Sequence, residues 1–323
     1  MRVLITGAAG LYGSNLVNLL VKKPEITHIY GVDNFSRNFF NPHPFIQCEE
    51  LDKKFTLIRK DYREIDTHFL NSLDVDAVIH LAAYVSIDES MEKPQEYFKN
   101  NEEATFNFVH NLYNTKNKPL LIYASSPEVY GNPHYVPMDE HHPMHPRSVY
   151  AVTKLACEKH CMALYEWYKY PVVVIRNFNT YGENQNIWGH SAIIPSLIEK
   201  ALLNKDFYIT GDGSQTRDFI YVKDAVEAYY SVLIRGKELA GSIFNIGTGM
   251  QNSMIDIARK ILEYSGSKSK IIFTEKRMGD LRALSADLSR IKQKVGWAPR
   301  YSIDEGLKNT IEWYRQYIKP GTE

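Results

Sequence analysis

The sequence is poor in cysteine: there are three in 323 residues, Cys48, Cys157 and Cys161. So small and odd a number excludes a disulfide-stapled secreted fold and favours a reducing compartment. The sequence also opens on an apolar strand pattern, residues 1–6, and not on a charged stretch followed by an apolar one, so no secretory signal is expected there. We therefore expect a cytoplasmic protein.

The sequence also lacks a long apolar run and an excess of charge of one sign. No apolar stretch approaches the roughly 18 residues that a membrane span needs. Lys plus Arg and Asp plus Glu each number 38, so the formal net charge is zero. Such a balance provides no overall field for nucleic acid or an acidic membrane surface, and we expect neither as a partner. Any anion must be bound by a few local residues.

Short strand patterns alternate with helical patterns through the first half of the chain. We predict strands at Arg2–Thr6, His28–Asp33, Phe55–Arg59, Ala77–Leu81, Leu120–Ala124 and Val172–Arg176. Between the second and third of these, residues 34–54 are expected to form a loop with a short helix. Strands that alternate with helices predict an α/β fold, a doubly wound parallel sheet with helices on both faces.

The alternation loosens after Arg176, where a second, smaller lobe is expected. We predict helices at Ile193–Leu203, Ser253–Tyr264, Leu288–Val295 and Ile303–Tyr317, and strands at Phe207–Thr210 and Ile243–Gly247. The last strand is expected to return to the main sheet. The predicted domains are therefore 1–176 plus about 218–250, and a mixed α/β lobe of about 177–217 and 251–323.

Three glycines, Gly7, Gly10 and Gly13, follow the first strand and open the first helical pattern. Glycines at such a turn let the backbone approach a pyrophosphate, whose charge is stabilised at the helix N-terminus. Asp33, at the end of the second strand, is placed to accept hydrogen bonds from ribose hydroxyls and to repel a 2′-phosphate, which favours NAD over NADP. The structural alternative is a glycine-rich turn with a surface aspartate.

A second constellation lies in mid-chain, where Tyr150 and Lys154 stand four residues apart and thus on one helix face. A tyrosine with an ordinary pKa near 10 is a poor base, and a nearby ammonium favours its phenolate. Ser125 and Ser126 end the preceding strand, at the edge where open α/β sheets bind ligands. The pair alone also fits a solvated helix face with a packed tyrosine.

These motifs resemble those of the extended short-chain dehydrogenases/reductases, in the NAD-dependent nucleotide-sugar epimerase/dehydratase family, and the resemblance runs nearly end to end. Further matching blocks are His80–Ala83, Tyr130–Gly131, Arg176–Asn179, Gly211–Phe219 and Gly279–Arg282. The resemblance implies a Rossmann-type sheet and an enzyme that oxidises C4 of a nucleotide-linked hexose. Asn177 departs from it, because many members carry a tyrosine there, and Ala104 replaces a usual glycine.

The resemblance also implies roles for individual residues. It places NAD against Gly7, Gly10, Leu11, Tyr12, Gly13, Asp33, Asn34, Asp61, Tyr62, Leu81, Ala82, Ala83, Asn101, Tyr150, Lys154 and Phe178. It implies that Ser126 binds the sugar 4-hydroxyl, that Tyr150 removes its proton and that Lys154 tunes Tyr150. The nucleotide diphosphate would contact Asn179, Arg217 and Arg282, whose guanidinium groups suit phosphate oxygens.

The fate of the 4-keto sugar stays open at this point. Glu128 stands where the 4,6-dehydratases and the UDP-glucuronate decarboxylases place a glutamate, so it is a candidate base at C5. Pro127 occupies the position of the aspartate acid of dTDP-glucose dehydratases and has no proton to give, which weakens the dehydratase alternative without removing it, because the GDP-mannose dehydratases manage without that aspartate. Glu128 could also serve as a rim carboxylate or a cap. Because the other blocks look more like the epimerase branch, we favour a 4-epimerase of the UDP-glucose/UDP-GlcNAc type, then a 4,6-dehydratase, then a decarboxylase.

Two further expectations concern assembly and alternatives. Relatives commonly pair two helices of each subunit into a four-helix bundle, so we expect a homodimer through residues 96–114 and 150–168. The histidines at 141, 142 and 145 are interpreted as a solvated loop, with no metal site expected. A protein that senses NAD without turnover is a remote alternative, since such relatives typically lose the tyrosine or the lysine.

Overall fold

The computed structural model describes residues 1–37, 45, 49–187, 192–275 and 283–318. A seven-stranded sheet forms its centre, with the order β11-β6-β5-β4-β1-β2-β3 and parallel pairing throughout. Its strands are β1 (Arg2–Thr6), β2 (His28–Asp33), β3 (Phe55–Arg59), β4 (Ala77–His80), β5 (Leu120–Ser125), β6 (Val172–Asn177) and β11 (Ser242–Ile246). The predicted doubly wound parallel sheet is confirmed.

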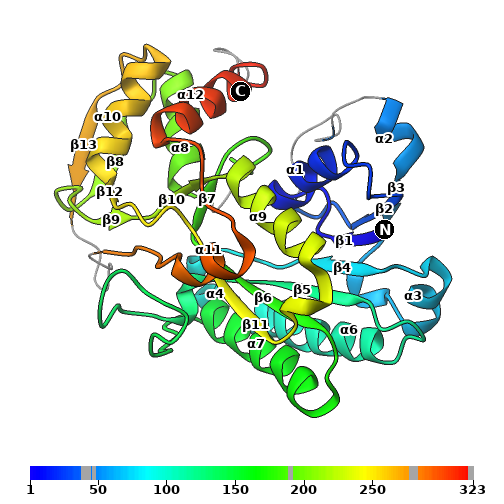
Figure 1. Ribbon diagram of the computed structural model, residues 1–323. Coiled ribbons are helices and arrows are strands. Elements are labelled where there is room, and N and C mark those ends of the chain that lie inside the picture. Colours follow the sequence, from blue (N-terminus) through cyan, green and yellow to red (C-terminus); the bar gives the residue numbers. More distant parts are fainter. Residues whose placement is uncertain (38–44, 46–48, 188–191, 276–282, 319–323) are drawn as a thin grey trace.

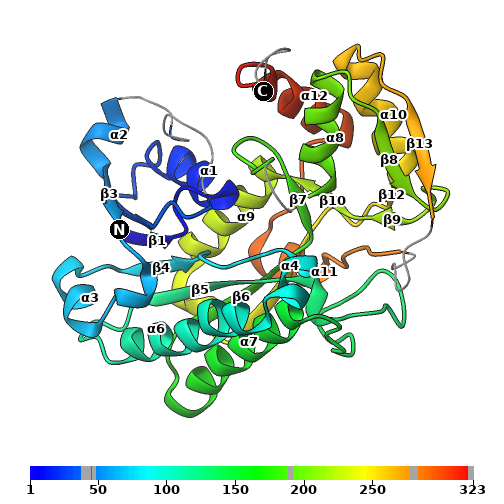
Figure 2. The ribbon, with the colours of Figure 1, turned by 180° about the vertical axis from the view of Figure 1, so that it is seen from behind.

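Helices cover both faces of this sheet (Figures 1 and 2). One face carries α3 (Thr67–Leu73), α6 (Ala104–Tyr113) and α7 (Val149–Tyr168), and the other carries α1 (Leu11–Leu20), α9 (Val222–Arg235) and α11 (Ser289–Val295). Every residue of β4 and of β5 is buried. Continuous burial of this kind explains why the strand sequences are nearly uniformly apolar, as in other two-sided parallel sheets.

The strand order reverses beside β1, which lies between β4 and β2. In open α/β sheets a ligand binds at such a reversal, beyond the carboxyl ends of the strands. Short elements gather there: α4 (Ile87–Glu92), α5 (Pro94–Tyr97) and the π-helical turn η2 (Phe98–Glu103) follow β4, and η3 (Pro127–Val129) follows β5. The topology thus predicts the location of the site before any side chain is considered.

A smaller lobe follows β6 and lies at one end of the sheet (Figures 1 and 2). Its link is the parallel pair β7 (Asn179–Tyr181) and β10 (Phe219–Tyr221). Its other elements are α8 (Ile193–Leu202), β8 (Phe207–Thr210), β9 (Thr216–Arg217), β12 (Asn252–Ser253), α10 (Met254–Ser265), β13 (Ile271–Thr274) and α12 (Ile303–Arg315). The strands pair as β8 with β13 and β9 with β12.

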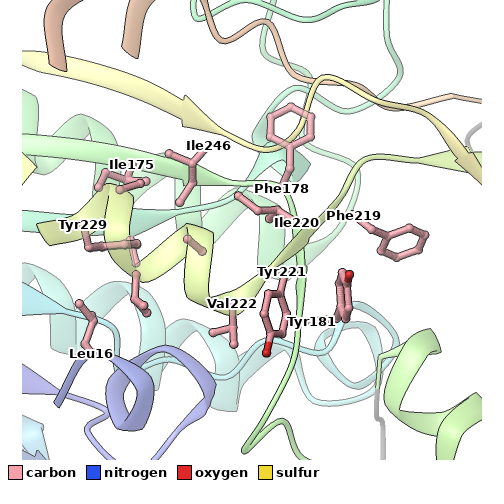
Figure 3. Close-up of a cluster of buried hydrophobic side chains, with 14 of the residues drawn as sticks. Leu16, Ile175, Phe178, Tyr181, Phe219, Ile220, Tyr221, Val222, Tyr229 and Ile246 are labelled. Atoms are coloured by element: carbon pink, nitrogen blue, oxygen red, sulfur yellow. The ribbon is translucent and has the colours of Figure 1, made fainter. Parts of the chain in front are cut away.

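One apolar cluster joins this lobe to the sheet. Figure 3 shows residues of α1, β6, β7, β10, α9 and β11 converging, among them Leu16, Ile175, Phe178, Tyr221 and Tyr229. A second cluster fills the opposite face of the sheet beneath α3, α6 and α7. Because the first cluster is continuous across the link, the lobe is packed against the sheet at the edge where the ligand site is expected.

Four strands, β1, β2, β3 and β8, have the predicted bounds, and other predicted bounds differ from the structure by one or two residues. The helix predicted from Ser253 starts one residue later, because the Ser253 side chain is its N-cap and accepts from the Asp256 N–H. The strand predicted to end at Gly247 ends at Ile246. A Cβ at Gly247 would lie 2.7 Å from Asp218 Oδ2, so this position has left the strand to make room for that carboxylate.

The remaining helical segments are α2 (Glu49–Lys54), η1 (Tyr62–Glu64) and η4 (Gly236–Leu239). The helix expected over 96–114 is interrupted by η2, so α5, η2 and α6 form one irregular rod. Within the described ranges, no helix is both long enough and apolar enough to cross a membrane.

Candidate active site

The glycine turn is shaped for a close approach by a ligand. Gly7 has φ +72°, and a Cβ there would meet the Ala82 nitrogen at 2.9 Å. A Cβ at Gly13 would lie 2.2 Å from the Gly7 carbonyl oxygen, so neither position tolerates a side chain. Gly10 is the N-cap of α1 and contributes no side-chain cap, and Leu11 begins the helix. The positive end of α1 therefore faces the site through bare backbone, as a pyrophosphate requires.

Asp33 is anchored against this turn. Its Oδ2 accepts from the Ala9 N–H at 2.9 Å and its Oδ1 from the Phe35 N–H at 2.7 Å. Burial raises the pKa of its carboxyl, and these two hydrogen bonds oppose that rise. The carboxylate thus lies at the end of β2 beside the glycine turn, where a ribose would be held.

Arg37, four residues further on, reaches across the site to α4. Its Nη1 and Nη2 donate to the two carboxylate oxygens of Glu89 at 2.8 and 3.1 Å, and its guanidinium lies 4.2 Å from the centre of the Tyr84 ring. Glu89 also accepts from the Tyr97 hydroxyl at 3.0 Å. Because β1 lies between β2 and β4, this ion pair joins the segments on either side of the glycine turn.

Two predicted adenosine contacts lie next to each other. The Asn34 amide donates to Asp61 Oδ2 at 2.9 Å, and Arg63 forms a two-pronged pair with the same carboxylate at 2.8 and 2.7 Å. The Arg63 pair lowers the pKa of Asp61 to about 2, so it stays ionised. Tyr62 instead packs inward, 5.0 Å from the His80 ring, and its hydroxyl donates to the Asn100 carbonyl. Only the main chain of Tyr62 is thus left for an adenine.

The segment after β4 runs directly beside the glycine turn. The Leu81 and Ala82 N–H groups each donate to Thr6 Oγ1 at 3.3 Å, and Ala83 follows them. Asn101, on η2, fixes the next residue, because its amide oxygen accepts from the Tyr84 N–H and its amide nitrogen donates to the Tyr84 carbonyl, both at 2.8 Å. The predicted nicotinamide-ribose segment is therefore held from below by β1 and from the side by η2.

Ser126 and Tyr150 meet at the carboxyl end of β5. Ser126 caps η3, with its Oγ accepting from the Glu128 N–H at 3.2 Å, and its side chain also hydrogen-bonds the Tyr150 phenol. Tyr150 lies in the first turn of α7, which begins after the N-cap Ser148. Burial raises the pKa of Tyr150 to about 12, while the Ser126 hydrogen bond lowers it and the Glu128 charge raises it.

Lys154 lies one turn along α7 and is also buried. Its Nζ donates to the Ala124 carbonyl at 2.8 Å and lies 5.2 Å from the centre of the Tyr123 ring. Burial lowers the pKa of Lys154 to about 8. The serine, tyrosine and lysine named from the sequence therefore converge on the end of β5, and the direct effect of Lys154 on Tyr150 stays a prediction.

Glu128 lies near enough to Tyr150 for its charge to act on the phenol. Burial raises the pKa of its carboxyl, while the charges of Arg217 and Arg147 lower it. Arg217 comes from β9 in the smaller lobe, so the two lobes contribute opposite charges to the site. The Glu128 side chain is not a cap of η3, because the capping acceptor is Ser126. A partly buried carboxylate beside a phenol is an arrangement that general acid–base catalysis can use, and the catalytic roles of Glu128 and Tyr150 stay predictions.

The remaining predicted contacts lie at the link between the lobes. The amide nitrogen of Asn179 is buried and meets no hydrogen-bond acceptor among the described residues, so it is a donor left for a ligand. Tyr12 directs its hydroxyl to Thr180 Oγ1, and Phe178 is buried in the apolar cluster, so both offer main chain to a cofactor. Arg282, predicted to bind the diphosphate, lies outside the described residues.

The histidine loop is only partly solvated, as His141 and His145 are exposed but His142 is buried, contrary to the interpretation from sequence. His142 Nε2 faces the His134 N–H at 2.9 Å and its Nδ1 faces the Pro143 carbonyl at 2.8 Å. His141 Nε2 lies 2.7 Å from Arg290, and His145 stacks on His134. Within the described ranges, no group of three His, Cys, Asp or Glu side chains could hold a metal.

Sequence reasoning missed several residues that shape this site. Asp218 is fully buried and its carboxylate accepts from the N–H groups of Thr248, Gly249 and Ala286 at 2.7 to 3.0 Å, which fixes the loops next to Arg217. The Arg37–Glu89 pair and Arg147 were missed as well. Asp218 lies between β9 and β10 and is followed by the apolar β10, but no local pattern marks it as buried, and the other residues depend on segments that are distant in sequence.

Comparison with known proteins agrees with this geometry. The profile of the GDP-mannose 4,6 dehydratase family matches residues 4–310. The UDP-glucose 4-epimerase of Mycolicibacterium smegmatis is 30% identical over 316 residues, covering 98% of this chain and 99% of that protein. The human dTDP-D-glucose 4,6-dehydratase is 31% identical over 331 residues, covering 98% and 90%.

A solved structure places the cofactor in this fold. The UDP-glucuronic acid 4-epimerase of Bacillus cereus, in complex with UDP-glucuronic acid and NAD, superimposes with a TM-score of 0.86 at 30% identity, covering 98% of this chain and 99% of that one. The bare glycine turn and the anchored Asp33 of this chain are consistent with NAD as its cofactor. The chain belongs to the NAD-dependent nucleotide-sugar epimerase/dehydratase family of extended short-chain dehydrogenases/reductases, as its sequence motifs predict.

Proposed function

We propose that this protein is a nucleotide-sugar 4-epimerase that acts on a UDP-hexose. The observation that carries the proposal is that, among the described residues, the charge acting on Tyr150 is that of one carboxylate, Glu128, and that the residue after Ser126 is Pro127, which has no proton to give. Inversion at C4 needs one acid–base group and a hydride acceptor. Elimination of water from C5 and C6 needs a base at C5 and also an acid for the departing hydroxyl.

The chain's own residues supply the proton chemistry. Ser126 would accept and orient the sugar 4-hydroxyl, and Tyr150 would take its proton as the C4–H bond breaks. NAD, held by the glycine turn and Asp33, would supply reversible hydride-acceptor chemistry at C4. Lys154 would hold the nicotinamide ribose and favour the phenolate of Tyr150. The 4-keto sugar must turn over between the two steps while its diphosphate stays bound.

The smaller lobe would keep hold of that diphosphate. The buried Asn179 amide and Arg217 lie beside the site, and Arg282 is proposed as a third contact from its sequence position. The domain division at about residues 176, 218 and 250 then separates cofactor binding from substrate binding. An arginine fork holds phosphate oxygens well enough to anchor a substrate whose sugar moves.

The second candidate is a 4,6-dehydratase, which the partly buried Glu128 beside Tyr150 favours. A decarboxylase ranks third, because no arginine has been assigned to a sugar carboxylate. To test the proposal, the purified protein and NAD are incubated with UDP-, GDP-, dTDP- and CDP-hexoses in deuterated water and followed by NMR. Product of unchanged mass with inverted C4 supports the epimerase; loss of water with deuterium at C5 contradicts it.

A non-catalytic sensor of NAD is excluded by a related experiment. Tyr150→Phe removes the phenolic oxygen and keeps the aromatic ring, so the packing around the site stays intact. If the protein is an enzyme, this variant loses turnover of the sugar that the wild type accepts but still binds NAD. Equal behaviour of the two proteins toward every sugar would support the sensor.

The same helices that carry the site also support a proposed homodimer. The outer side of the η2–α6 and α7 layer exposes Phe98, Phe106, Val152 and Trp167, the last at 81%. Apolar side chains gathered on one helical face are typical of a subunit interface. In sedimentation experiments Phe98→Glu should yield monomers, whereas Tyr208→Glu, an equally exposed site on the smaller lobe, should not.

A cytoplasmic location is also proposed. Cys157 and Cys161 are free thiols buried on α7, and burial raises the pKa of Cys157 to about 11, so both behave as apolar fillers. Unpaired cysteines are typical of a reducing compartment. Fractionation of the cells that produce the protein would test this.

A further inference from the structure

Asn177, the last residue of β6, joins three elements at the active-site edge of the sheet. Its Nδ2 donates to the Ser125 carbonyl at 3.1 Å and to the Tyr229 hydroxyl at 2.9 Å. That hydroxyl donates in turn to Asn177 Oδ1 at 3.1 Å. Tyr229 is fully buried on α9, within the apolar cluster of Figure 3. The amide of Asn177 is therefore held in one orientation by a side chain that cannot move.

The carbonyl that Asn177 holds precedes the serine of the site. Two consecutive carbonyls leave the end of β5: the Ala124 carbonyl accepts from Lys154 Nζ at 2.8 Å, and the Ser125 carbonyl accepts from Asn177. The Ser125 hydroxyl donates to Glu158 Oε2 at 3.1 Å, on the helix that carries Tyr150. The backbone that places Ser126 is thus fixed by three side chains, and Asn177 is the one that comes from outside α7.

The Ser126 hydroxyl in turn acts on the catalytic phenol, because its hydrogen bond lowers the pKa of Tyr150. A displacement of Ser126 by a few tenths of an ångström weakens that bond, since hydrogen-bond strength falls steeply with misalignment. Tyrosine, which many members carry at the position of Asn177, has no amide to donate to the Ser125 carbonyl.

We propose that Asn177, oriented by Tyr229, is a positioning residue for C4 oxidation: it holds the Ser125 carbonyl and thereby sets the Ser126 hydroxyl against Tyr150. This inference rests on the proposed C4 chemistry but holds for an epimerase and a dehydratase alike. It predicts that Asn177 acts on kcat through Tyr150 and leaves substrate binding nearly unchanged.

The test is Asn177→Leu, which keeps the size of the side chain and adds no charge. The matched control is Asn111→Leu on α6, whose Nδ2 likewise donates to a backbone carbonyl, that of Ile65 at 3.0 Å, far from the pocket. For Asn177→Leu we expect kcat at pH 7 to fall about tenfold and the acid limb of its pH profile to move up by roughly one unit, with KM within about twofold. Asn111→Leu should move neither.

Tyr229→Phe keeps the inference testable if Asn177→Leu folds poorly, and a double variant tests the route through Ser126. Tyr229→Phe removes one oxygen and should shift the acid limb in the same direction by a smaller amount. In a Ser126→Ala background, Asn177→Leu should lower kcat little further, because the Ser126 hydroxyl that Asn177 positions is absent. An unmoved pH limb, or effects that multiply in the double variant, would overturn the inference. A wild-type protein that turns over no sugar would overturn the premise instead.

Discussion

Replacing Glu128 with glutamine distinguishes the two leading functions. In a 4-epimerase the Glu128 charge only opposes ionisation of Tyr150, since it raises the pKa of that phenol. The charges of Arg217 and Arg147 oppose that of the carboxylate, and its effect on Tyr150 is smaller than the effects of burial and of the Ser126 hydrogen bond. We therefore expect epimerisation at pH 7 to rise roughly two- to fivefold in Glu128→Gln.

In a 4,6-dehydratase the same change removes the C5 base and should lower the rate by about 10² to 10⁴. The thermal stability of the variant provides an independent test of Glu128. Burial raises the pKa of Glu128 in the folded protein, so the ionised carboxylate destabilises the fold at any pH above the pKa that this group has in the unfolded chain. The melting temperature of Glu128→Gln should therefore exceed that of the wild type at pH 7 and nearly equal it at pH 4. The assay is initial rate by NMR or coupled absorbance, with melting in parallel. A fall of a hundredfold in a protein that melts higher would refute the epimerase reasoning.

Three other predictions test the cofactor site and the core. Arg37→Ala should speed NAD dissociation about tenfold in a stopped-flow chase, because the ion pair with Glu89 no longer spans the glycine turn. The control Arg315→Ala, which breaks an exposed ion pair with Glu312, should leave the dissociation rate unchanged. Equal dissociation rates in the two variants would contradict the prediction. Arg176→Met should lower the free energy of unfolding, measured in urea, by about 3–5 kcal/mol, because it leaves the buried Glu158 carboxylate without its ion-pair partner. The double variant Arg176→Met/Glu158→Leu should recover much of the lost stability. A single variant as stable as the wild type would contradict the prediction. His80 is buried between Thr6 and Thr105, and burial lowers its pKa to about 3. The stability that its neutral imidazole contributes is therefore complete above about pH 6.5 and is lost as the pH falls toward 3. His80→Gln should therefore reduce the slope of unfolding free energy against pH by about 1.4 kcal/mol per unit in that window, and an unchanged slope would show that His80 titrates normally.

Much of the fold follows from local sequence. The strands β1, β2, β3 and β8 have the predicted bounds, because each is a short apolar run with a clear stop. The glycine turn was predictable because Gly7 needs a left-handed φ and Gly13 needs an empty Cβ position, both of which only glycine meets. Tyr150 and Lys154 were predictable because their spacing on one helix suffices to place them together.

Other parts of the site depend on contacts that no local pattern carries. Glu89 meets Arg37 52 residues away, and Asn177 meets Tyr229 at the same separation. The side chain of Tyr62 faces the core, although its position in the motif suggested the adenine, because a ring there fills the space beside His80 and Phe108. Packing of this kind is decided by the whole sheet and its helices, so it appears only in the structure.

The most direct test of the central claim follows the hydrogen at C4. A UDP-hexose carrying deuterium at C4 is incubated with the protein and NAD in ordinary water, and the product is examined by NMR. A 4-epimerase built on Ser126, Tyr150 and Lys154 returns that deuterium to C4, so the product is the C4 epimer with its label in place. Deuterium found at C6 of a 4-keto-6-deoxy sugar would contradict the account and assign Glu128 as the base of a dehydratase.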